Sequence, residues 1–225
     1  MTEAIRVERL GVRVGRKTIL EDVSLTVMPG RTAAIVGGAG AGKSVFLRTL
    51  LGHFTRSSGE LRVVGFDPGV NPRDVTRHTT FVANPDVFEP QLTTLQNVVH
   101  LLTLVGAPVP DREQLVRALR DVDVPDRLID ARTAELSGLE ALAVWLSIAS
   151  LRTSSLVLLD EPTEFLGPAD TMRLASLLHE VSTRGTAVLL TTRDKRFAED
   201  STSSTYLLES GHILPAHSLS TVASR

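Results

Sequence analysis

The hydrophobic pattern divides the chain into three parts. In the first and last parts, short apolar or alternating runs bounded by turn residues predict β-strands, and in the middle part apolar residues three and four positions apart predict helices. A turn is expected over 56–59 and a loop over 67–72. The expected strands are 4–10, 19–27, 32–36, 60–66, 79–83, 156–161, 186–191, 206–209 and 212–214, and the expected helices are 45–51, 95–105, 112–122, 139–151 and 171–182.

This order predicts one α/β domain in which a helical part is inserted between two halves of a β core. The chain has 225 residues and is 42% hydrophobic, which is enough for a sizeable core. A formal charge of −2 disfavours a dedicated nucleic-acid binder. Without cysteine there is no disulfide framework and no thiolate metal site. The first residues lack a signal-peptide pattern, and the longest apolar run, 139–151, is too short to span a membrane, so we expect any membrane role to come through a partner.

A glycine-rich stretch lies between the predicted strand 32–36 and the predicted helix 45–51. Strand, glycine-rich loop and helix in this order are typical of a phosphate-binding P-loop, in which backbone N–H groups surround the anion. Lys43 is expected to reach the β- and γ-phosphates and Ser44 to hold Mg²⁺. An ordinary glycine-rich turn is the alternative, and the complete pattern disfavours it. The stretch consists of Gly37, Gly38, Ala39, Gly40, Ala41, Gly42, Lys43 and Ser44.

Two carboxylates, Asp160 and Glu161, end the aliphatic run 156–159. The C-terminal end of a buried parallel strand is where α/β proteins bind ligands, so Asp160 is the candidate second Mg²⁺ ligand. Glu161 is a candidate to accept a proton from an attacking water. A solvated acidic pair is the alternative, and the Pro162-Thr163 that follows and the Leu136-Ser137-Gly138 upstream disfavour it.

With these motifs the chain resembles the ATP-binding cassette (ABC) ATPases over nearly its whole length. The resemblance implies an α/β fold of the P-loop NTPase ABC type, with a mainly parallel core sheet, an N-terminal antiparallel β part and an inserted helical subdomain. It implies a single ABC ATPase domain, 1–225, with 1–83 and 152–215 in the core, 84–151 in the helical subdomain and 216–225 as a loose tail. The matching motifs are Leu20-Glu21-Asp22-Val23-Ser24-Leu25, Pro29-Gly30, the P-loop, Ser58-Gly59-Glu60, Leu136-Ser137-Gly138, Leu159-Asp160-Glu161-Pro162-Thr163 and Glu209-Ser210-Gly211.

The function that the resemblance implies is the ATP-binding subunit of an ABC transporter, with ATP and Mg²⁺ as cofactors. Its implied partners are a membrane-spanning transporter subunit and a second cassette, in a homodimer or heterodimer, and not a nucleic acid. Its implied location is cytoplasmic, on the inner face of the cell membrane through the partner. Ser137 and Gly138 are expected to contact the nucleotide held by the opposite cassette, and Val14 and Val45 to contact the chain's own nucleotide.

Several motif positions depart from the family pattern. Asn84 stands where a glutamine usually contacts Mg²⁺ and the attacking water, and Gly167 where an aspartate is usual. Val14 replaces the aromatic residue that stacks on adenine. Arg193 replaces a histidine that touches the γ-phosphate; it could stabilise phosphate charge in catalysis, or it could hold Glu161 in an ion pair.

The signature motif departs too, because Leu139 and Glu140 replace a glycine and a glutamine. Leu139 places a side chain where close backbone approach is expected, and Glu140 either brings negative charge near a polyphosphate or points to water. These changes predict ATP hydrolysis that is slow or depends on a partner. Two functions therefore stay open: an ATPase subunit of a transporter, or a hydrolysis-poor, nucleotide-gated regulatory subunit of a membrane complex.

Overall fold

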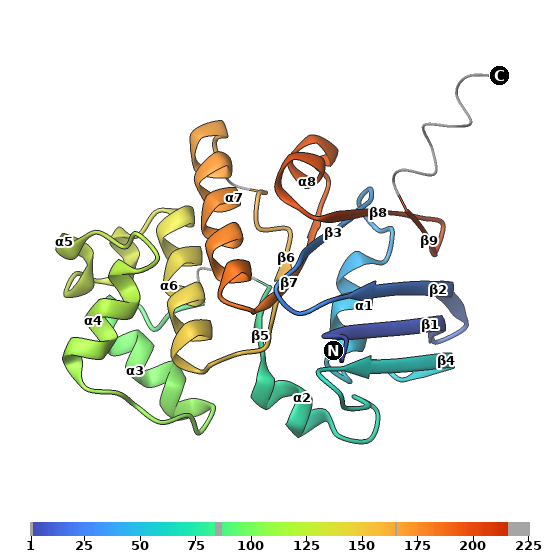
Figure 1. The fold of residues 1–225 in the computed structure, drawn as a ribbon, viewed down its shortest axis with the longest axis horizontal. Coiled ribbons are helices and arrows are strands. Elements are labelled where there is room, and N and C mark those ends of the chain that lie inside the picture. Colours follow the sequence, from blue (N-terminus) through green and yellow to red (C-terminus); the bar gives the residue numbers. More distant parts are fainter. Residues whose placement is uncertain (1, 84–86, 165, 216–225) are drawn as a thin grey trace.

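The computed structural model describes residues 2–83, 87–164 and 166–215, and within them the strands form two sheets (Figure 1). In the antiparallel sheet the order is β2 (Lys17–Val27), β1 (Ile5–Val14) and β4 (Arg56–Val63). In the other sheet neighbouring strands are parallel, except that β9 is antiparallel to β8. Its order is β5 (Thr79–Val82), β6 (Leu156–Asp160), β7 (Ala187–Thr192), β3 (Thr32–Val36), β8 (Ser204–Glu209) and β9 (His212–Pro215).

The helices gather in distinct places around these sheets. Figure 1 shows α3 to α6 together on the side away from the antiparallel sheet, with α7 and α8 nearer the parallel sheet. Among the residues that the structure describes, no helix has the length and apolar character needed to cross a membrane. The helices are α1 (Lys43–Leu50), α2 (Pro72–His78), α3 (Thr94–Leu104), α4 (Arg112–Arg120), α5 (Asp126–Ile129), α6 (Gly138–Leu151), α7 (Pro168–Thr183) and α8 (Lys195–Ser201), with a 3₁₀ turn at Thr133–Glu135.

Alternating residues of the central strands bury both faces of the parallel sheet. In β6, Leu156 and Leu158 pack into a core shared with the antiparallel sheet and α1. Val157 and Leu159 point the other way, into a core shared with α6 and α7. When both faces of a parallel sheet are covered, a ligand can reach it only at the strand ends. The C-terminal ends of β3, β6 and β7 are therefore the expected place for a ligand-binding site.

The predicted fold class is confirmed, and each predicted strand and helix is present with bounds shifted by a few residues. Residues 56–59, predicted as a turn, are instead the start of β4, so that prediction was wrong. Gly59 has a φ of +81° and lies against the carbonyls of Glu8 and Arg9, at a register shift of the β1–β4 pair. The turn-like composition of 56–59 therefore corresponds to a bulge in a strand, at a position where a side chain would not fit.

The helices α2, α5 and α8 were not predicted from the sequence. In α8 only Phe197 and Ala198 are buried, so no apolar stripe signals the helix. Its start is set by Asp194, whose side chain accepts a hydrogen bond from Phe197 N at 2.9 Å. Asn84, predicted to follow the end of the strand 79–83, lies outside the described residues, as do residues 216–225, predicted to be a loose tail.

Candidate functional site

The loop between β3 and α1 depends on glycine. Gly40 and Gly42 have φ values of +74° and +104°, which favour glycine, and α1 begins at Lys43 directly afterwards. A Cβ on Gly37 would lie 2.6 Å from the carbonyl oxygen of Leu208, so the loop packs tightly against β8. This is the strand, loop and helix arrangement expected of a phosphate-binding loop, with the helix start available to an anion.

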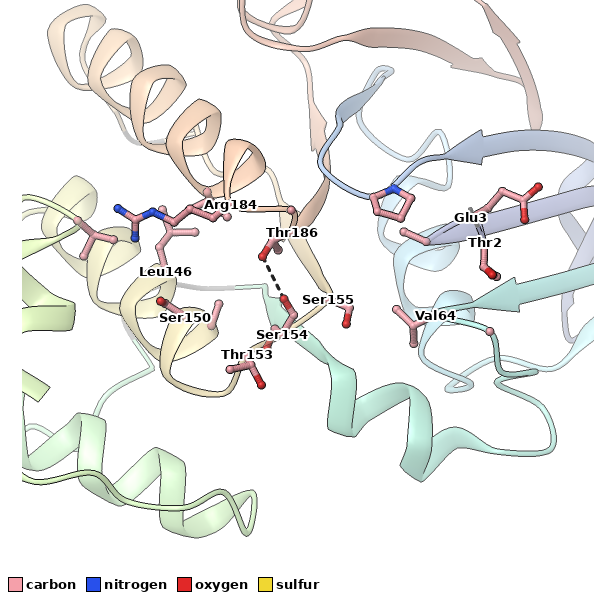
Figure 2. A pocket seen from close by; sticks show the side chains of 17 residues that line it. Thr2, Glu3, Val64, Leu146, Ser150, Thr153, Ser154, Ser155, Arg184 and Thr186 are labelled. Carbon is pink, nitrogen blue, oxygen red and sulfur yellow. Dashed lines mark hydrogen bonds between the residues drawn. The ribbon is translucent and has the colours of Figure 1, made fainter. Parts of the chain in front are cut away.

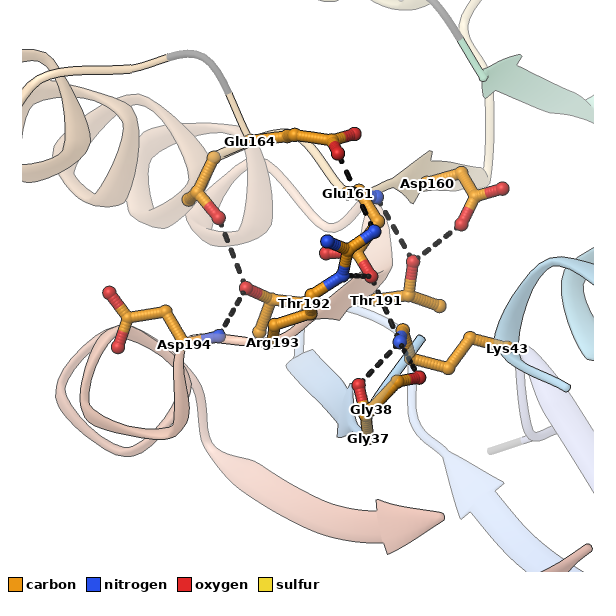
Figure 3. A network of polar contacts seen from close by, with 11 residues as sticks. Gly37, Gly38, Lys43, Asp160, Glu161, Glu164, Thr191, Thr192, Arg193 and Asp194 are labelled. Atoms are coloured by element: carbon orange, nitrogen blue, oxygen red, sulfur yellow. Dashed lines mark hydrogen bonds and ion pairs between the residues drawn. The ribbon is translucent and has the colours of Figure 1, made fainter. Parts of the chain in front are cut away.

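Lys43 is buried inside this loop and contacts a carboxylate of another segment. Its Nζ donates to the carbonyl oxygens of Gly37 and, at 2.9 Å, Gly38. The same Nζ lies 2.9 Å from Oε1 of Glu161 (Figure 3). The structure therefore brings together two residues that lie far apart in the sequence and that the sequence analysis selected separately.

Both acidic residues are fixed by one buried hydroxyl, that of Thr191 on the neighbouring strand β7. Its Oγ1 donates to Oδ1 of Asp160 at 2.7 Å and accepts from the backbone N–H of Glu161 at 3.0 Å (Figure 3). Glu161 itself has a φ of +52°, a left-handed conformation that is uncommon for a residue with a side chain and typical of functional sites. Thr191 was not predicted as a site residue, although a hydroxyl at the end of a buried parallel strand is a usable signal.

Replacement of Thr191 by valine keeps the shape of the side chain and removes its hydroxyl. We expect ATP affinity measured with Mg²⁺ to fall about tenfold, because Asp160 loses the donor that orients it, a loss on the order of 1–2 kcal/mol. Affinity measured with EDTA should change little. Isothermal titration with and without Mg²⁺ measures the difference. Thr80→Val is the matched control, since Thr80 is also buried and hydrogen-bonds Ser154 at 2.9 Å on β5; an equal loss of Mg²⁺ dependence in both variants would contradict the assignment.

Arg193, the residue after β7, also points to Glu161. Its Nε lies 3.6 Å from Oε1 of Glu161, and its Nη2 lies 3.5 Å from Oε1 of Glu164 (Figure 3). Of the two roles that the sequence left open for Arg193, the ion pair with Glu161 is the one present in the structure. Glu161 therefore has cations on two sides, Lys43 and Arg193.

These groups surround a cavity of about 380 Å³, within the range of small-molecule sites, which is about 300–1,000 Å³. Gly37 and Gly38 are outside its lining and contact Lys43 through their carbonyl oxygens. Val14 ends β1 with 43% of its surface exposed and is not among the described lining residues. The lining consists of Ile19, Ala39, Gly40, Ala41, Gly42, Lys43, Ser44, Val45, Ala83, Asp160, Glu161, Glu164 and Arg193.

The predicted Mg²⁺ ligands fit this cavity chemically. Ser44 and Asp160 both line it and offer a hydroxyl and a carboxylate, the oxygen ligands that Mg²⁺ prefers. Within the described residues there is no group of three or more histidine, aspartate or glutamate side chains that could hold a metal by itself. The donor set therefore suits an ion that takes its remaining ligands from phosphates and water.

Ser137 and Gly138 lie elsewhere, at the start of α6. Oγ of Ser137 accepts from the N–H of Glu140 at 3.3 Å, and Oε2 of Glu140 accepts from the N–H of Ser137 at 2.7 Å. Arg127 lies 3.6 Å from the other oxygen of Glu140. Glu140 therefore caps its own helix, with 21% of its side chain exposed, and Leu139 is buried in the core.

A second cavity, of about 710 Å³, lies at the opposite ends of the parallel strands (Figure 2). Its lining includes Ser154 and Ser155 just before β6 and Thr186 just before β7. Thr186 Oγ1 donates to the carbonyl of Ser154 at 3.1 Å. Because ligands of open α/β sheets bind at the C-terminal strand ends, the candidate site is the cavity around Lys43.

Comparisons with known proteins agree with this geometry. The family model described as "ABC transporter" matches residues 20–164, more than half of the chain. The aliphatic sulfonates import ATP-binding protein SsuB of Granulibacter bethesdensis is 33% identical, over 97% of this chain and 85% of that protein. The structure of cbiO1 from Clostridium perfringens, titled as part of the ABC transporter complex cbiONQ, has a TM-score of 0.86 at 22% identity and covers 100% of this chain and 92% of that one.

A second solved structure is titled as a dimeric post-hydrolysis state of the ATP-binding cassette MJ0796 bound to ADP and Pi. It has a TM-score of 0.77 at 21% identity, with 93% of this chain and 96% of that chain covered. At these identities the two structures establish the similarity of the folds.

Proposed function

The chain belongs to the ABC transporter family as an ATPase cassette, and from this membership we propose that it binds ATP with Mg²⁺ and couples ATP binding and hydrolysis to a membrane-spanning subunit. The observation that carries the proposal is the meeting of Lys43, Asp160 and Glu161 at one cavity, where β3 and β6 end. A phosphate cradle, a metal ligand and a carboxylate base are the parts that hydrolysis of a nucleoside triphosphate requires.

In this proposal the loop 39–44 and Lys43 bind the phosphates, and Ser44 and Asp160 hold Mg²⁺. When bound there, the ion would supply positive charge to the phosphate groups. Thr191 keeps Asp160 and the backbone of Glu161 in fixed positions, so the two carboxylates keep separate roles. Val45 lines the same cavity and contacts the bound nucleotide.

Glu161 is the proposed base for the attacking water. In the structure its Oε1 contacts Lys43, whose ammonium is also the expected partner of the terminal phosphates. When Lys43 turns to a phosphate, that contact weakens and the carboxylate can accept a hydrogen bond from water. Asn84, which lies outside the described residues, stays a proposed ligand of Mg²⁺ and a proposed contact of the attacking water.

We also propose a second cassette, a copy of this chain or a different one, as a partner. Ser137 and Gly138 do not line the cavity around Lys43, although the resemblance gives them a nucleotide contact. A partner cassette facing this one would bring its own signature motif to the cavity and receive Ser137 at its own site. The related cassette MJ0796 is described as a dimer.

For the membrane-spanning subunit we propose a groove of about 490 Å³ between α2 and the end of α3. Leu104, at the end of α3, has 67% of its surface exposed there. Arg73, Arg77 and Arg152 line the groove, and no acidic residue is among its described lining residues. Burial lowers the pKa of Arg152, which donates to the carbonyls of α2 and β5. The occupant that fits is an apolar, acidic cytoplasmic segment of the membrane subunit.

Replacement of Leu104 by glutamate tests this groove, since it adds a negative charge and removes exposed apolar surface. We expect the variant to lose sedimentation with membranes from cells that make the chain naturally, while its ATP affinity stays unchanged. Leu214→Glu is the matched control, because Leu214 is also exposed but lies on the edge strand β9. Retention of Leu104→Glu on the membranes would argue against the groove.

The alternative function is a hydrolysis-poor, nucleotide-gated regulatory subunit of a membrane complex. The contact between Arg193 and Glu161 is the observation that favours it. Both functions place the chain at the cytoplasmic face of the membrane through its partner. They are separated by measuring ATP binding and phosphate release on one preparation, since binding with release no faster than that of Glu161→Gln indicates the regulatory subunit.

A further inference from the structure

One carboxylate oxygen of Glu161 contacts two cations, the buried Lys43 and the solvent-exposed Arg193. Lys43 Nζ and Arg193 Nε lie 2.9 and 3.6 Å from the same Oε1. The side chain of Glu161 is 15% exposed and that of Arg193 is 56% exposed, so Arg193 covers the carboxylate from the solvent side. Lys43 approaches from within the phosphate loop, where two backbone carbonyls also hold it.

Arg193 has a second anchor that does not depend on nucleotide. Its Nη2 lies 3.5 Å from Oε1 of Glu164, three residues after Glu161 in the same turn. The hydroxyls of Thr163 and Thr192 lie 3.0 Å apart and join the same two segments a second time. The turn after β6 and the turn after β7 are therefore tied together beside the cavity (Figure 3).

We propose that Arg193 is a positioning residue that holds Glu161 in an ion pair and thereby keeps ATP hydrolysis slow. The proposal rests on the ATPase function proposed above. A carboxylate oxygen serves as a base only when it is directed at the water, and here Oε1 of Glu161 contacts both an ammonium and a guanidinium. The guanidinium gives Glu161 a cationic partner, whereas a neutral histidine at this position would leave the carboxylate without that partner.

We expect bound ATP to affect the contact of Glu161 with Lys43 more than its contact with Arg193. The phosphates offer Lys43 a stronger anionic partner, which draws the ammonium away from Glu161. Arg193 keeps Glu164 as a neighbour and lies on the solvent side, so it stays beside Glu161 after the nucleotide is bound. The expected consequence is a long-lived ATP-bound state, in which Arg193 limits the chemical step and leaves binding almost unchanged.

Three single variants and one double variant test this role. Arg193→Gln removes the charge, Arg193→Lys keeps it, and Arg196→Gln is the matched control, since Arg196 is an exposed arginine paired with Asp200 on α8. We expect kcat of phosphate release to rise about fivefold or more in Arg193→Gln, with the Kd for Mg-ATP within about threefold of wild type. Arg193→Lys and Arg196→Gln should both stay near the wild-type kcat. Adding Glu161→Gln to Arg193→Gln should return release to background.

Three results would overturn the proposal, and each can be told apart from the others. If Arg193→Gln binds Mg-ATP normally but its kcat is unchanged or lower, the proposal is overturned, and a lower value would place Arg193 on the phosphates as a catalytic group. If Arg193→Lys accelerates hydrolysis as much as Arg193→Gln, charge is not what holds Glu161, and the proposal fails as well. If the wild-type chain itself does not bind Mg-ATP, the proposed function fails and this inference fails with it. Thermal unfolding of each variant verifies that it is folded.

Discussion

Alanine in place of Lys43 is expected to weaken ATP binding about 100-fold or more. The substitution removes the ammonium that we propose binds the phosphates, and it leaves Glu161, which is largely buried, without its closest cation. The free carboxylate then faces the anionic phosphates in a partly desolvated cavity, where like charges repel strongly. A loss of about 3 kcal/mol from the two effects corresponds to a little over a hundredfold in Kd.

Isothermal titration of Mg-ATP into wild type and Lys43→Ala measures this loss. Lys195→Ala is the matched control, because Lys195 is an exposed lysine that pairs with Glu199, one helical turn away on α8. We expect Lys195→Ala to bind like wild type. A Kd for Lys43→Ala within a few-fold of wild type would show that the loop 37–44 is not the phosphate site.

Glutamine in place of Glu161 is expected to abolish hydrolysis while ATP still binds. The amide keeps the size of the side chain and the backbone hydrogen bond to Thr191, but it cannot take a proton from water. General base catalysis contributes about 10²–10⁴-fold to a rate, so release of phosphate should fall to background. Affinity for ATP should be equal or higher, because a negative charge beside the phosphates is gone.

The measurement for Glu161→Gln is steady-state phosphate release beside ATP binding on the same preparation. Glu180→Gln serves as its control, since Glu180 is an exposed glutamate on α7, outside the described lining of the cavity. Undiminished release by Glu161→Gln would assign the base to another residue. Loss of binding in this variant would instead give Glu161 a structural role in the loop.

The parts of the site that could be predicted from the sequence are those formed by residues adjacent to one another in the chain. A glycine-rich loop between a strand and a helix, and two acids that end an aliphatic strand, are local patterns with a direct physical meaning. They were enough to select 39–44, Asp160 and Glu161, which line one cavity in the structure. The same holds for the fold class, because strand and helix periods are local properties of the sequence.

The remaining contacts depend on how distant segments meet. Thr191 holds Asp160 because β7 lies beside β6 in a parallel register, and neither the strand order nor the register can be read from the residues alone. The bridge from Arg193 to Glu164 requires two turns to lie side by side. Glu140 is a different case, because its capping box with Ser137 is a recognisable local pattern whose consequence the sequence analysis did not draw.

The central claim is that this chain hydrolyses ATP with Glu161 as the base, and its most direct test is single-turnover hydrolysis of bound Mg-ATP by wild type and Glu161→Gln. Both proteins are saturated with nucleotide first, so differences in affinity do not enter. We predict that wild type converts its bound ATP to ADP and phosphate, slowly, and that Glu161→Gln retains ATP unchanged over the same time. Equal conversion by wild type and Glu161→Gln would contradict the claim, and so would the absence of conversion in both wild type and Arg193→Gln.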